Sequence, residues 1–484
     1  MNRIKNVALG FSAVFALAFA SCSEESGSSS AIHFPDGFQA TQEIEGLNDM
    51  LQIPVRSSGQ WQATVLDSCR WIYLVSESGS GDGQVTFAVG TNLSDEERTG
   101  KIRISNGEAY VDYTLKQHPY TGNGGNSAED VQYENSGLGK GMYMENYGGN
   151  SLYDMMAGQI FQFRAMDDAP FDSIQFISTV NLPHTEIRLD DFAKADTSLT
   201  DIKADLTVNV KYGLFSLGLT GDFHMFGESR DTTKTWAGNV QRPLERSTLN
   251  YANISMNYSW KPNMDAAYKA ARASLYDPTF LYLLDEIEKK INQEDATVDR
   301  NGQCSDSDLE YLLSDLDYYY GPAFVSSVTR GGSVSIDFQA NESYSNDTLS
   351  VGGSLTVGFN SLFSIDGKAS AEYLRAAKSL LNGSTLHLVI EGGTMATQNK
   401  MITALSDIVK PGADQNVDAI LEAITAWSDE IKSENATISD VSVQGIWSLF
   451  SRNSRNYVRS YMVSKYPNNP DGSCPYMYNV QKIR

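Results

Sequence analysis

The chain has 484 residues, and 60 acidic against 37 basic side chains give it a formal net charge of -23. This balance argues against a nucleic-acid partner, because phosphate binding depends on clustered Lys and Arg. The four cysteines and five histidines are scattered and match no zinc-ligand spacing, so we expect no metal and no cofactor. The length is sufficient for about three domains at roughly 150 residues each.

Residues 1–22 have the features of a bacterial export signal. Arg3 and Lys5 precede an apolar stretch that is too short for a stable membrane span. The small residues directly before Cys22 resemble a lipobox, and the acidic residues after it resemble the surface-export signal of Bacteroidetes-type lipoproteins. The resemblance implies lipid attachment at Cys22 and a lipoprotein exposed on the outer membrane or released from it. The alternative is a plain secretory signal with an incidental cysteine. Serine-rich residues 23–31 are expected to form a solvated tether.

Residues 32–120 have the alternation of half-buried strands. Val85, Phe87 and Val89 share one face of a short strand, and similar runs recur between turn sequences such as SGSGDG. Because six or seven short strands recur at this spacing, we expect an all-β, immunoglobulin-like sandwich. A Gly- and Asn-rich linker at residues 121–130 then marks a domain boundary.

Within this region, Trp61, Trp71, the SGSGDG turn and Gln117 resemble the BACON family of Bacteroidetes-associated, often N-terminal domains. The resemblance covers nearly all of residues 32–120. It implies either glycan binding or a spacer that holds the next domain away from the membrane. Trp61 and Trp71 are the candidate glycan-stacking residues, but a buried tryptophan is commoner in a sandwich, and we favour the core position.

From residue 131 onward no catalytic signature is found, so we do not expect an enzyme. Two stretches instead alternate apolar with small polar residues over the 9–11 residues that a membrane strand requires. We predict that their apolar residues face a membrane: Phe215, Leu217, Leu219, Phe223, Met225, Leu355, Val357, Phe359, Phe363 and Ile365.

Two further segments belong to this prediction. Residues 252–260 alternate Ala, Ile, Met, Tyr and Trp with polar residues and are predicted to be a return strand. Residues 366–383 are predicted to be an amphipathic helix, but their side chains also sort by polarity when the segment is extended. Both periods would be needed for conversion of a helix into a membrane strand. The alternative is an ordinary half-buried antiparallel sheet beside a surface helix.

Residues 309–336 resemble the signature of the membrane attack complex/perforin (MACPF) family. An apolar helix ends at Tyr320-Gly321, an aromatic strand follows, and Gly331 and Gly332 come next. The family usually has Gly-Thr-His after the tyrosine, whereas Pro322 follows Gly321 here, so the role of that histidine is missing. The likeness covers roughly residues 131–466 and leaves a tail at 467–484.

The MACPF resemblance implies an α+β domain with a bent central antiparallel sheet and two helical clusters. The clusters would lie between Phe215 and about Leu249, and between Phe363 and Ser384, and would unfold into membrane hairpins as subunits form a homo-oligomeric ring. Gly331 and Gly332 would sit at the sheet bend, where missing side chains allow flexing or close approach. The expected activity is pore formation in a target membrane, with competing bacteria as the expected targets.

Two points stay open at this stage. The same fold could serve a non-lytic adhesin or glycan-binding lipoprotein that recognises an unknown surface receptor or glycan. Three cysteines remain beyond Cys22, which allows one disulfide at most, and Cys304 with Cys474 is the pair we favour because Cys69 belongs to the sandwich.

Overall fold

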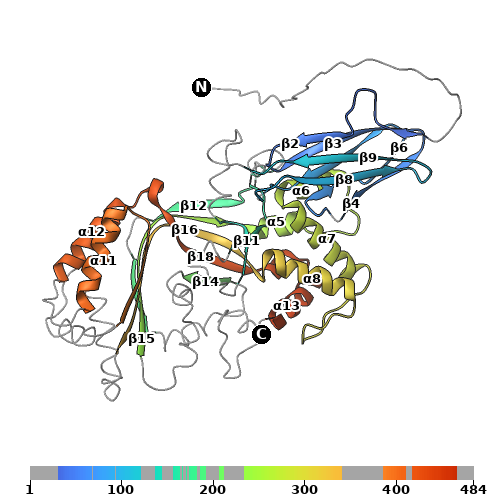
Figure 1. Cartoon of the computed structure of the whole chain (residues 1–484). Coiled ribbons are helices and arrows are strands. Elements are labelled where there is room, and N and C mark those ends of the chain that lie inside the picture. Colours follow the sequence, from blue (N-terminus) through green and yellow to red (C-terminus); the bar gives the residue numbers. More distant parts are fainter. Residues whose placement is uncertain are drawn as a thin grey trace.

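The computed structural model of the chain is shown in Figure 1. It describes residues 31–67, 69–92, 94–120, 137–143, 156–163, 166, 171, 174–182, 186–191, 207–211, 234–340, 385–409 and 417–465. Among these residues, no helix combines the length and the apolar composition needed to cross a membrane.

The first unit consists of two sheets built from short strands. The four-stranded sheet has the order β1-β3-β7-β5, and the five-stranded sheet has the order β2-β9-β8-β4-β6. All neighbours within these sheets are antiparallel except β2 and β9. In chain order the strands are β1 (Ile32–His33), β2 (Thr41–Ile44), β3 (Asp49–Ser57), β4 (Gln60–Leu66), β5 (Ile72–Leu74), β6 (Ser78–Ser80), β7 (Gly83–Val89), β8 (Arg98–Ser105) and β9 (Tyr110–Gln117).

The two sheets share one hydrophobic core, which makes the unit a sandwich. Val85, Phe87 and Val89 on β7 are fully buried, as the alternation in the sequence predicts, and they face Ile102 and Ile104 on β8. Apolar side chains at every second position of both sheets therefore fill one interior.

The second unit is built on a nine-stranded sheet, which contains the two longest strands in the described part of the chain. It is built around β15 and β16, with β10, β11, β12, β13, β14, β17 and β18 paired beside them. The strands are β10 (Lys140–Met142), β11 (Met156–Gln159), β12 (Ile177–Asn181), β13 (Glu186–Asp191), β14 (Thr207–Lys211), β15 (Lys234–Leu249), β16 (Ala323–Ala340), β17 (Thr385–Glu391) and β18 (Thr437–Gly445).

Helices lie at both ends of this sheet (Figure 1). A group of four connects β15 to β16, a pair follows β17, and α13 follows β18. The helices are α5 (Tyr251–Asn257), α6 (Ala266–Leu275), α7 (Pro278–Asn292), α8 (Ser307–Tyr320), α11 (Met395–Val409), α12 (Val417–Glu430) and α13 (Arg452–Lys465). Short 3-10 turns at Ser433–Asn435 and Ile446–Leu449 flank β18.

Local chemistry fixes the helix that leads into β16. The side chain of Asp306 caps α8 by accepting hydrogen bonds from the backbone N–H of Asp308 and Leu309. Gly321 ends the helix at φ +70, and a Cβ there would lie 2.4 Å from the carbonyl oxygen of Met142. Only glycine combines that backbone angle with so close an approach. The chain then enters β16 after Pro322, as the sequence predicts for the helix and aromatic strand.

Two sequence predictions are wrong in this part of the chain. The predicted return strand at 252–260 is instead mostly the helix α5, in which Ile254 is buried and Met256 is 72% exposed. A strand would have placed both residues on one face. The predicted first helical cluster, Phe215 to about Leu249, ends in a strand, because Lys234–Leu249 is β15. Pro243 within β15 lies at an irregularity in the pairing, where a missing N–H is tolerated.

Candidate functional site: the bent sheet and its strand ends

The central feature of the nine-stranded sheet is a pair of long antiparallel strands, β15 and β16. β15 and β16 are in register from Lys234 opposite Ala340 to Thr248 opposite Ser327, with one irregularity between Pro243 and Glu245. Figure 1 shows that both strands turn sharply beside α12. The irregularity therefore lies within a bent sheet, where extra twist is expected.

At the bend, β16 exchanges one neighbour for another. Residues 323–331 of β16 pair with β18, and residues 333–339 pair with β17. On the other side, β15 pairs with β12 through residues 245–249 and with β13 through residues 236–241. The sheet is thus divided into two parts that share only β15 and β16.

Four glycines meet where the partners change, and we call them the glycine corner: Gly331, Gly332, Gly392 and Gly393. A Cβ on Gly331 would lie 2.1 Å from the carbonyl oxygen of Arg242 on β15. Gly392 has φ +75, and a Cβ there would lie 2.9 Å from the Cα of Gly332. Real Cβ atoms do not come this close to backbone, so the missing side chains allow the strands to approach here.

The indole of Trp427 from α12 covers the glycine corner. A Cβ on Gly332 would lie 2.5 Å from Cζ2 of Trp427 and 2.6 Å from Cδ1 of Ile431. The indole Nε1 donates a 3.0 Å hydrogen bond to the carbonyl oxygen of Gly392, and the ring is fully buried. Gln398 of α11 donates a 3.1 Å hydrogen bond to the same carbonyl oxygen, so both helices of the α11–α12 pair contact the bend.

A second contact holds α11 against α12 near the corner. The carboxylate of Glu430 at the end of α12 accepts hydrogen bonds from the hydroxyl groups of Thr397 at 2.6 Å and Thr394 at 2.8 Å. These hydrogen bonds hold the pKa of Glu430 below its ordinary value, because they favour the charged form. The start of α11 and the end of α12 are therefore joined.

At the far end from the helix group α5–α8, the strands lie in the order β13-β15-β16-β17. Asp191, the last residue of β13, is opposite Trp236, and Ala340, the last residue of β16, is opposite Lys234. Thr385, the first residue of β17, is opposite Gln339. The connections 192–233 and 341–384 therefore both start and finish at this one end of the sheet.

All ten predicted membrane-facing residues fall within these two connections and outside the described residues, as does the predicted helix 366–383. Within the first connection, β14 is described, and it pairs with β18 rather than with β13 or β15. Phe215 to Met225 follow β14 in the chain and precede β15.

At the opposite end of the sheet, Tyr320 and Gly321 join α8 to β16. Tyr320 is buried, its ring meets the edge of Phe280 at 5.2 Å, and its hydroxyl donates to the carboxylate of Asp277 at 3.3 Å. Burial raises the pKa of Asp277, although the N–H groups of Thr279 and Phe280 oppose the shift. The signature residues thus form part of the packing between α7, α8 and the sheet.

The two candidate glycan-stacking tryptophans both contact other residues of the sandwich. Trp61 is 4% exposed, packs on Gly79 and Gly83, and donates from Nε1 to the carbonyl oxygen of Gly81 at 3.0 Å. Trp61 is therefore a core residue, and the alternative of glycan stacking is wrong for it. Trp71 is half-buried, and the guanidinium of Arg98 lies over its ring at 4.3 Å, so that face is not available to a sugar. Burial lowers the pKa of Arg98 to about 10.

The remaining predicted sites involve cysteines. Cys22 and Cys474 lie outside the described residues, and Cys304 is half-buried and unbridged within the described part of the chain. The Cys304–Cys474 disulfide stays a prediction, and so does lipid attachment at Cys22. In the ranges that the structure describes, no group of His, Cys, Asp and Glu is placed to hold a metal.

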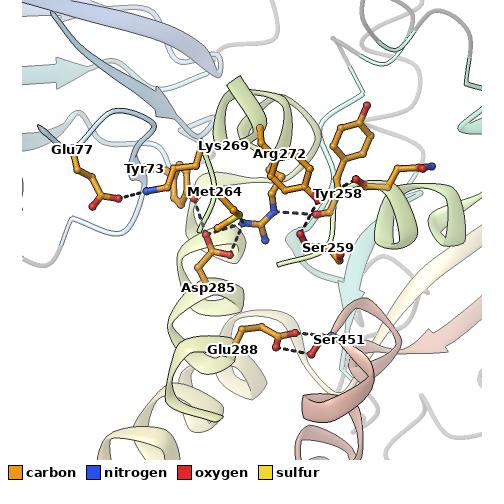
Figure 2. A network of polar contacts seen from close by, with 12 residues as sticks. Tyr73, Glu77, Tyr258, Ser259, Met264, Lys269, Arg272, Asp285, Glu288 and Ser451 are labelled. Atoms are coloured by element: carbon orange, nitrogen blue, oxygen red, sulfur yellow. Dashed lines mark hydrogen bonds and ion pairs between the residues drawn. The ribbon is translucent and has the colours of Figure 1, made fainter. Parts of the chain in front are cut away.

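An interface between the sandwich and the helix group α6–α8 was not predicted from the sequence (Figure 2). Tyr73 of β5 donates a 2.7 Å hydrogen bond to Asp285 of α7, and Asp285 pairs with Arg272 of α6, whose side chain is fully buried. Lys269 of α6 pairs with Glu77 beyond β5. Burial raises the pKa of Asp285, and the positive charge of Arg272 opposes this.

The interface continues beyond this network. Arg70 forms an ion pair with Asp315 of α8, and the amide of Asn48 donates to Gln162 at 2.8 Å. Tyr73 also belongs to the same hydrophobic core as the helices. The sandwich is therefore packed on the second unit through a shared core and several polar contacts.

Comparisons with known proteins found no protein-family model and no curated protein that match this sequence. Solved structures do match. The structure of GNIP1Aa from Chromobacterium piscinae has 15% identity and a TM-score of 0.41, over 66% of this chain and 54% of that one. A MAC/Perforin-domain protein from Bacteroides thetaiotaomicron has 11% identity and a TM-score of 0.40, over 70% of this chain and 64% of that one.

Pneumolysin matches with 12% identity and a TM-score of 0.22, over 55% of this chain and 40% of that one. The chain thus spans less than two thirds of the length of each of these three structures. The first two matches extend over more of the chain than the sandwich contains. One of the structures to which this chain is similar has a MAC/Perforin domain.

Proposed function

We propose that this protein is a pore-forming surface lipoprotein that inserts two amphipathic β-hairpins per subunit into a target membrane. The observation that carries the proposal is the strand order β13-β15-β16-β17, with the connections 192–233 and 341–384 at the same end. Each connection joins strands that are already antiparallel, so an extended hairpin could continue each pair without a change of strand order.

The sequence of both connections suits this role. In each, apolar residues alternate with small polar ones, as Phe215, Leu217 and Leu219 do in the first and Leu355, Val357 and Phe359 in the second. A strand of this kind presents one face to lipid and the other to water. The free energy for insertion would come from burying the apolar face, at about 25 cal/mol per Å².

Several subunits would be required. Backbone N–H and C=O groups must all be paired within the hydrocarbon, so membrane strands occur only in closed barrels. Four strands leave two open edges, which the strands of neighbouring subunits would pair. The proposal therefore includes a homo-oligomeric ring, and it involves no cofactor and no catalysis.

The glycine corner supports a change in sheet curvature. The four glycines carry no side chains that would interlock across the bend, and Trp427 is the large side chain that covers them. Opening of β17 away from β18 would first require Trp427 to leave Gly392. We infer that the α11–α12 pair holds the bent form of the sheet before insertion.

The site of action is part of the proposal. The lipobox-like sequence at Cys22 supports a lipid-anchored protein of the outer membrane surface, with competing bacteria as targets. A protein tethered in this way, or released from its tether, would meet target cells outside the cell that makes it.

The test places an environment-sensitive fluorophore at alternating positions of the second connection. In a variant with its mature cysteines replaced by Ser, a single cysteine is introduced at Val357 or at its neighbour Thr356 and labelled with NBD. On mixing with vesicles of bacterial outer-membrane lipid, NBD emission should rise at 357 and stay low at 356, together with release of an encapsulated dye. Leu219 and Thr220 form the same matched pair in the first connection.

The result also separates the two functions that the sequence leaves open. Dye release with alternating NBD signals supports the pore. Saturable binding to the vesicles, without dye release and without a signal at 357, would contradict insertion and favour the non-lytic adhesin.

A further inference from the structure

A cleft of about 990 Å³ lies between the sandwich and the helices α6 and α7. One wall comes from β4, β5 and the loop between them, and the other from α6, α7 and residues 260–265. Tyr73 and Asp285, whose contact is drawn in Figure 2, both line it. Ligand sites are commonly clefts of about 300–1,000 Å³ at such boundaries between domains.

The charges along the cleft are balanced, although the whole chain has a net charge of -23. Four basic and four acidic residues line it: Arg70, Lys261, Lys269, Lys289, Glu77, Asp265, Asp285 and Glu286. A ligand that binds chiefly through its own charge would meet both signs at once, so the lining does not favour an anion or a cation.

These charged groups are also engaged with protein partners. Lys269 pairs with Glu77, and Arg70 with Asp315 of α8. Lys289 lies 3.8 Å from Glu286. Charged groups already paired in this way have less to gain from a charged ligand than unpaired ones.

The other charged residues are engaged as well. Lys261 lies over the ring of Tyr268 at 3.9 Å, and Asp265 caps α6 by accepting from the N–H of Tyr268 at 2.8 Å. Asp285 pairs with Arg272 and accepts from Tyr73. All eight charged residues of the lining thus have a partner.

The uncharged polar groups of the cleft differ in this respect. Within the described part of the chain, the side-chain amides of Gln62, Asn263 and Gln293 are exposed and have no hydrogen-bond partner in the protein. In the same described part, the indole N–H of Trp260 and the hydroxyl of Tyr282 also have no hydrogen-bond partner. An amide offers both donors and acceptors, and the half-buried ring of Trp260 adds an apolar face with a polar tip. Arg70 lies over the ring of Tyr282 at 5.8 Å, so Tyr282 offers chiefly its hydroxyl.

We propose that this cleft binds a neutral oligosaccharide. A sugar presents hydroxyl groups that both donate and accept, which suits the free amides and the hydroxyl of Tyr282, and apolar ring faces that suit Trp260. It carries no charge, which suits a lining whose charges are already paired. The ligand would touch the sandwich and the helices together. The inference does not depend on membrane insertion, and it assigns recognition to the boundary between the two units rather than to Trp61 or Trp71.

The experiment measures binding without any membrane. The mature chain is titrated calorimetrically with a panel of neutral hexasaccharides: cellohexaose, maltohexaose, chitohexaose, mannohexaose and xylohexaose. We expect saturable binding of at least one of them, weakened at least tenfold in W260A and in Y282A. Y110A is the control for loss of an aromatic side chain, since Tyr110 is an exposed aromatic residue on β9 outside the cleft. Thermal unfolding establishes that each variant is folded.

A second readout uses a native thiol. Cys69 lines the cleft and Cys304 does not, and both are half-buried free thiols. In the unmodified chain, the bound hexasaccharide should slow maleimide labelling of Cys69 and leave the labelling rate of Cys304 unchanged. This readout needs no substitution in the cleft, so it holds even if a cleft variant fails to fold. Absence of binding by the unmodified chain to every member of the panel overturns the proposal. Binding by W260A, Y282A and N263A that is as strong as binding by Y110A also overturns the proposal.

Discussion

The hydroxyl of Tyr73 donates a 2.7 Å hydrogen bond to the carboxylate of Asp285, across 212 positions of sequence. Tyr73 belongs to the sandwich and Asp285 to α7, so this contact links two units that the sequence presents as separate domains. Asp285 also pairs with the fully buried guanidinium of Arg272. One carboxylate therefore satisfies donors from both sides of the boundary.

Replacing Tyr73 with Phe removes the hydroxyl and leaves the ring in the shared core. We expect the free energy of unfolding to fall by about 1–3 kcal/mol, because a buried acceptor loses a donor. Urea denaturation at neutral pH measures the change. Tyr110→Phe is the control, since the Tyr110 ring is 59% exposed, and it should have no effect beyond experimental error. Equal effects of the two substitutions would show that the hydrogen bond between Tyr73 and Asp285 contributes nothing to stability.

The pair of Arg272 and Asp285 should behave as a coupled unit. Arg272→Met or Asp285→Leu alone leaves a charge buried without its partner, and each should cost about 3–5 kcal/mol. The double substitution should cost clearly less than the two single costs together, because it leaves neither charge. A double-mutant cycle followed by urea denaturation gives the coupling energy. Strictly additive costs would contradict a direct interaction.

The glycine corner makes a specific prediction for Gly332. An added Cβ would lie 2.5 Å from the indole of Trp427 and 2.6 Å from Ile431, so Gly332→Ala should displace α12 and cost about 1–3 kcal/mol. Gly59→Ala is the matched control, because a Cβ there meets no atom within 4 Å. Tryptophan fluorescence should also change in the first variant and not in the second. Unchanged stability and fluorescence in Gly332→Ala would show that Trp427 does not cover this corner in solution.

Glu430 provides a prediction about pH. Its pKa is lowered by hydrogen bonds from Thr397 and Thr394, so the folded state binds a proton less readily than the unfolded chain does. The stability that Glu430 contributes is therefore present above the ordinary carboxyl pKa and is lost as the pH falls through the lower folded value. Between about pH 7 and pH 3, the stability difference between the unmodified chain and Glu430→Gln should shrink toward zero. A stability difference that grows on acidification would show that the pKa of Glu430 is raised, rather than lowered, in the folded state.

The sequence predicts the elements whose local pattern and tertiary role agree. Val85, Phe87 and Val89 alternate because β7 has one face in the core, and the structure buries all three. The helix before Tyr320 and the strand after Gly321 have clear start and stop signals, and they are found as α8 and β16. At Gly331 and Gly332, the pattern indicates close approach of other groups, but it does not reveal that Trp427 is one of them.

Residues 252–260 were misassigned for a physical reason. Ile254 and Tyr258 are four residues apart. This spacing places them on the same face of a strand and also about one turn apart in a helix, so a short segment suits both periods. The buried neighbours of Ile254 come from elsewhere in the chain and select the helix. The resemblance to the MACPF family places a helical cluster between Phe215 and about Leu249, and it does not indicate that the second half of this range is β15. Pro243 is unusual within a strand, and the irregularity that accommodates it depends on the partner β16.

The interface between the units could not be predicted from the sequence at all. Tyr73 and Arg272 look like ordinary residues of a strand and of an amphipathic helix, and charged helix residues usually face solvent. Their burial depends on the packing of β5 against α6 and α7, which no local pattern encodes.

The short link between α8 and β16 has a mechanical consequence. Only Gly321 and Pro322 separate the helix from the strand, and Arg70 joins the sandwich to the same helix through Asp315. The sandwich, the α5–α8 group and the near part of the sheet therefore form one packed body. In the proposed insertion, the part beyond the glycine corner would move relative to this body, which the contacts of Tyr73, Asp285 and Arg272 help to hold together.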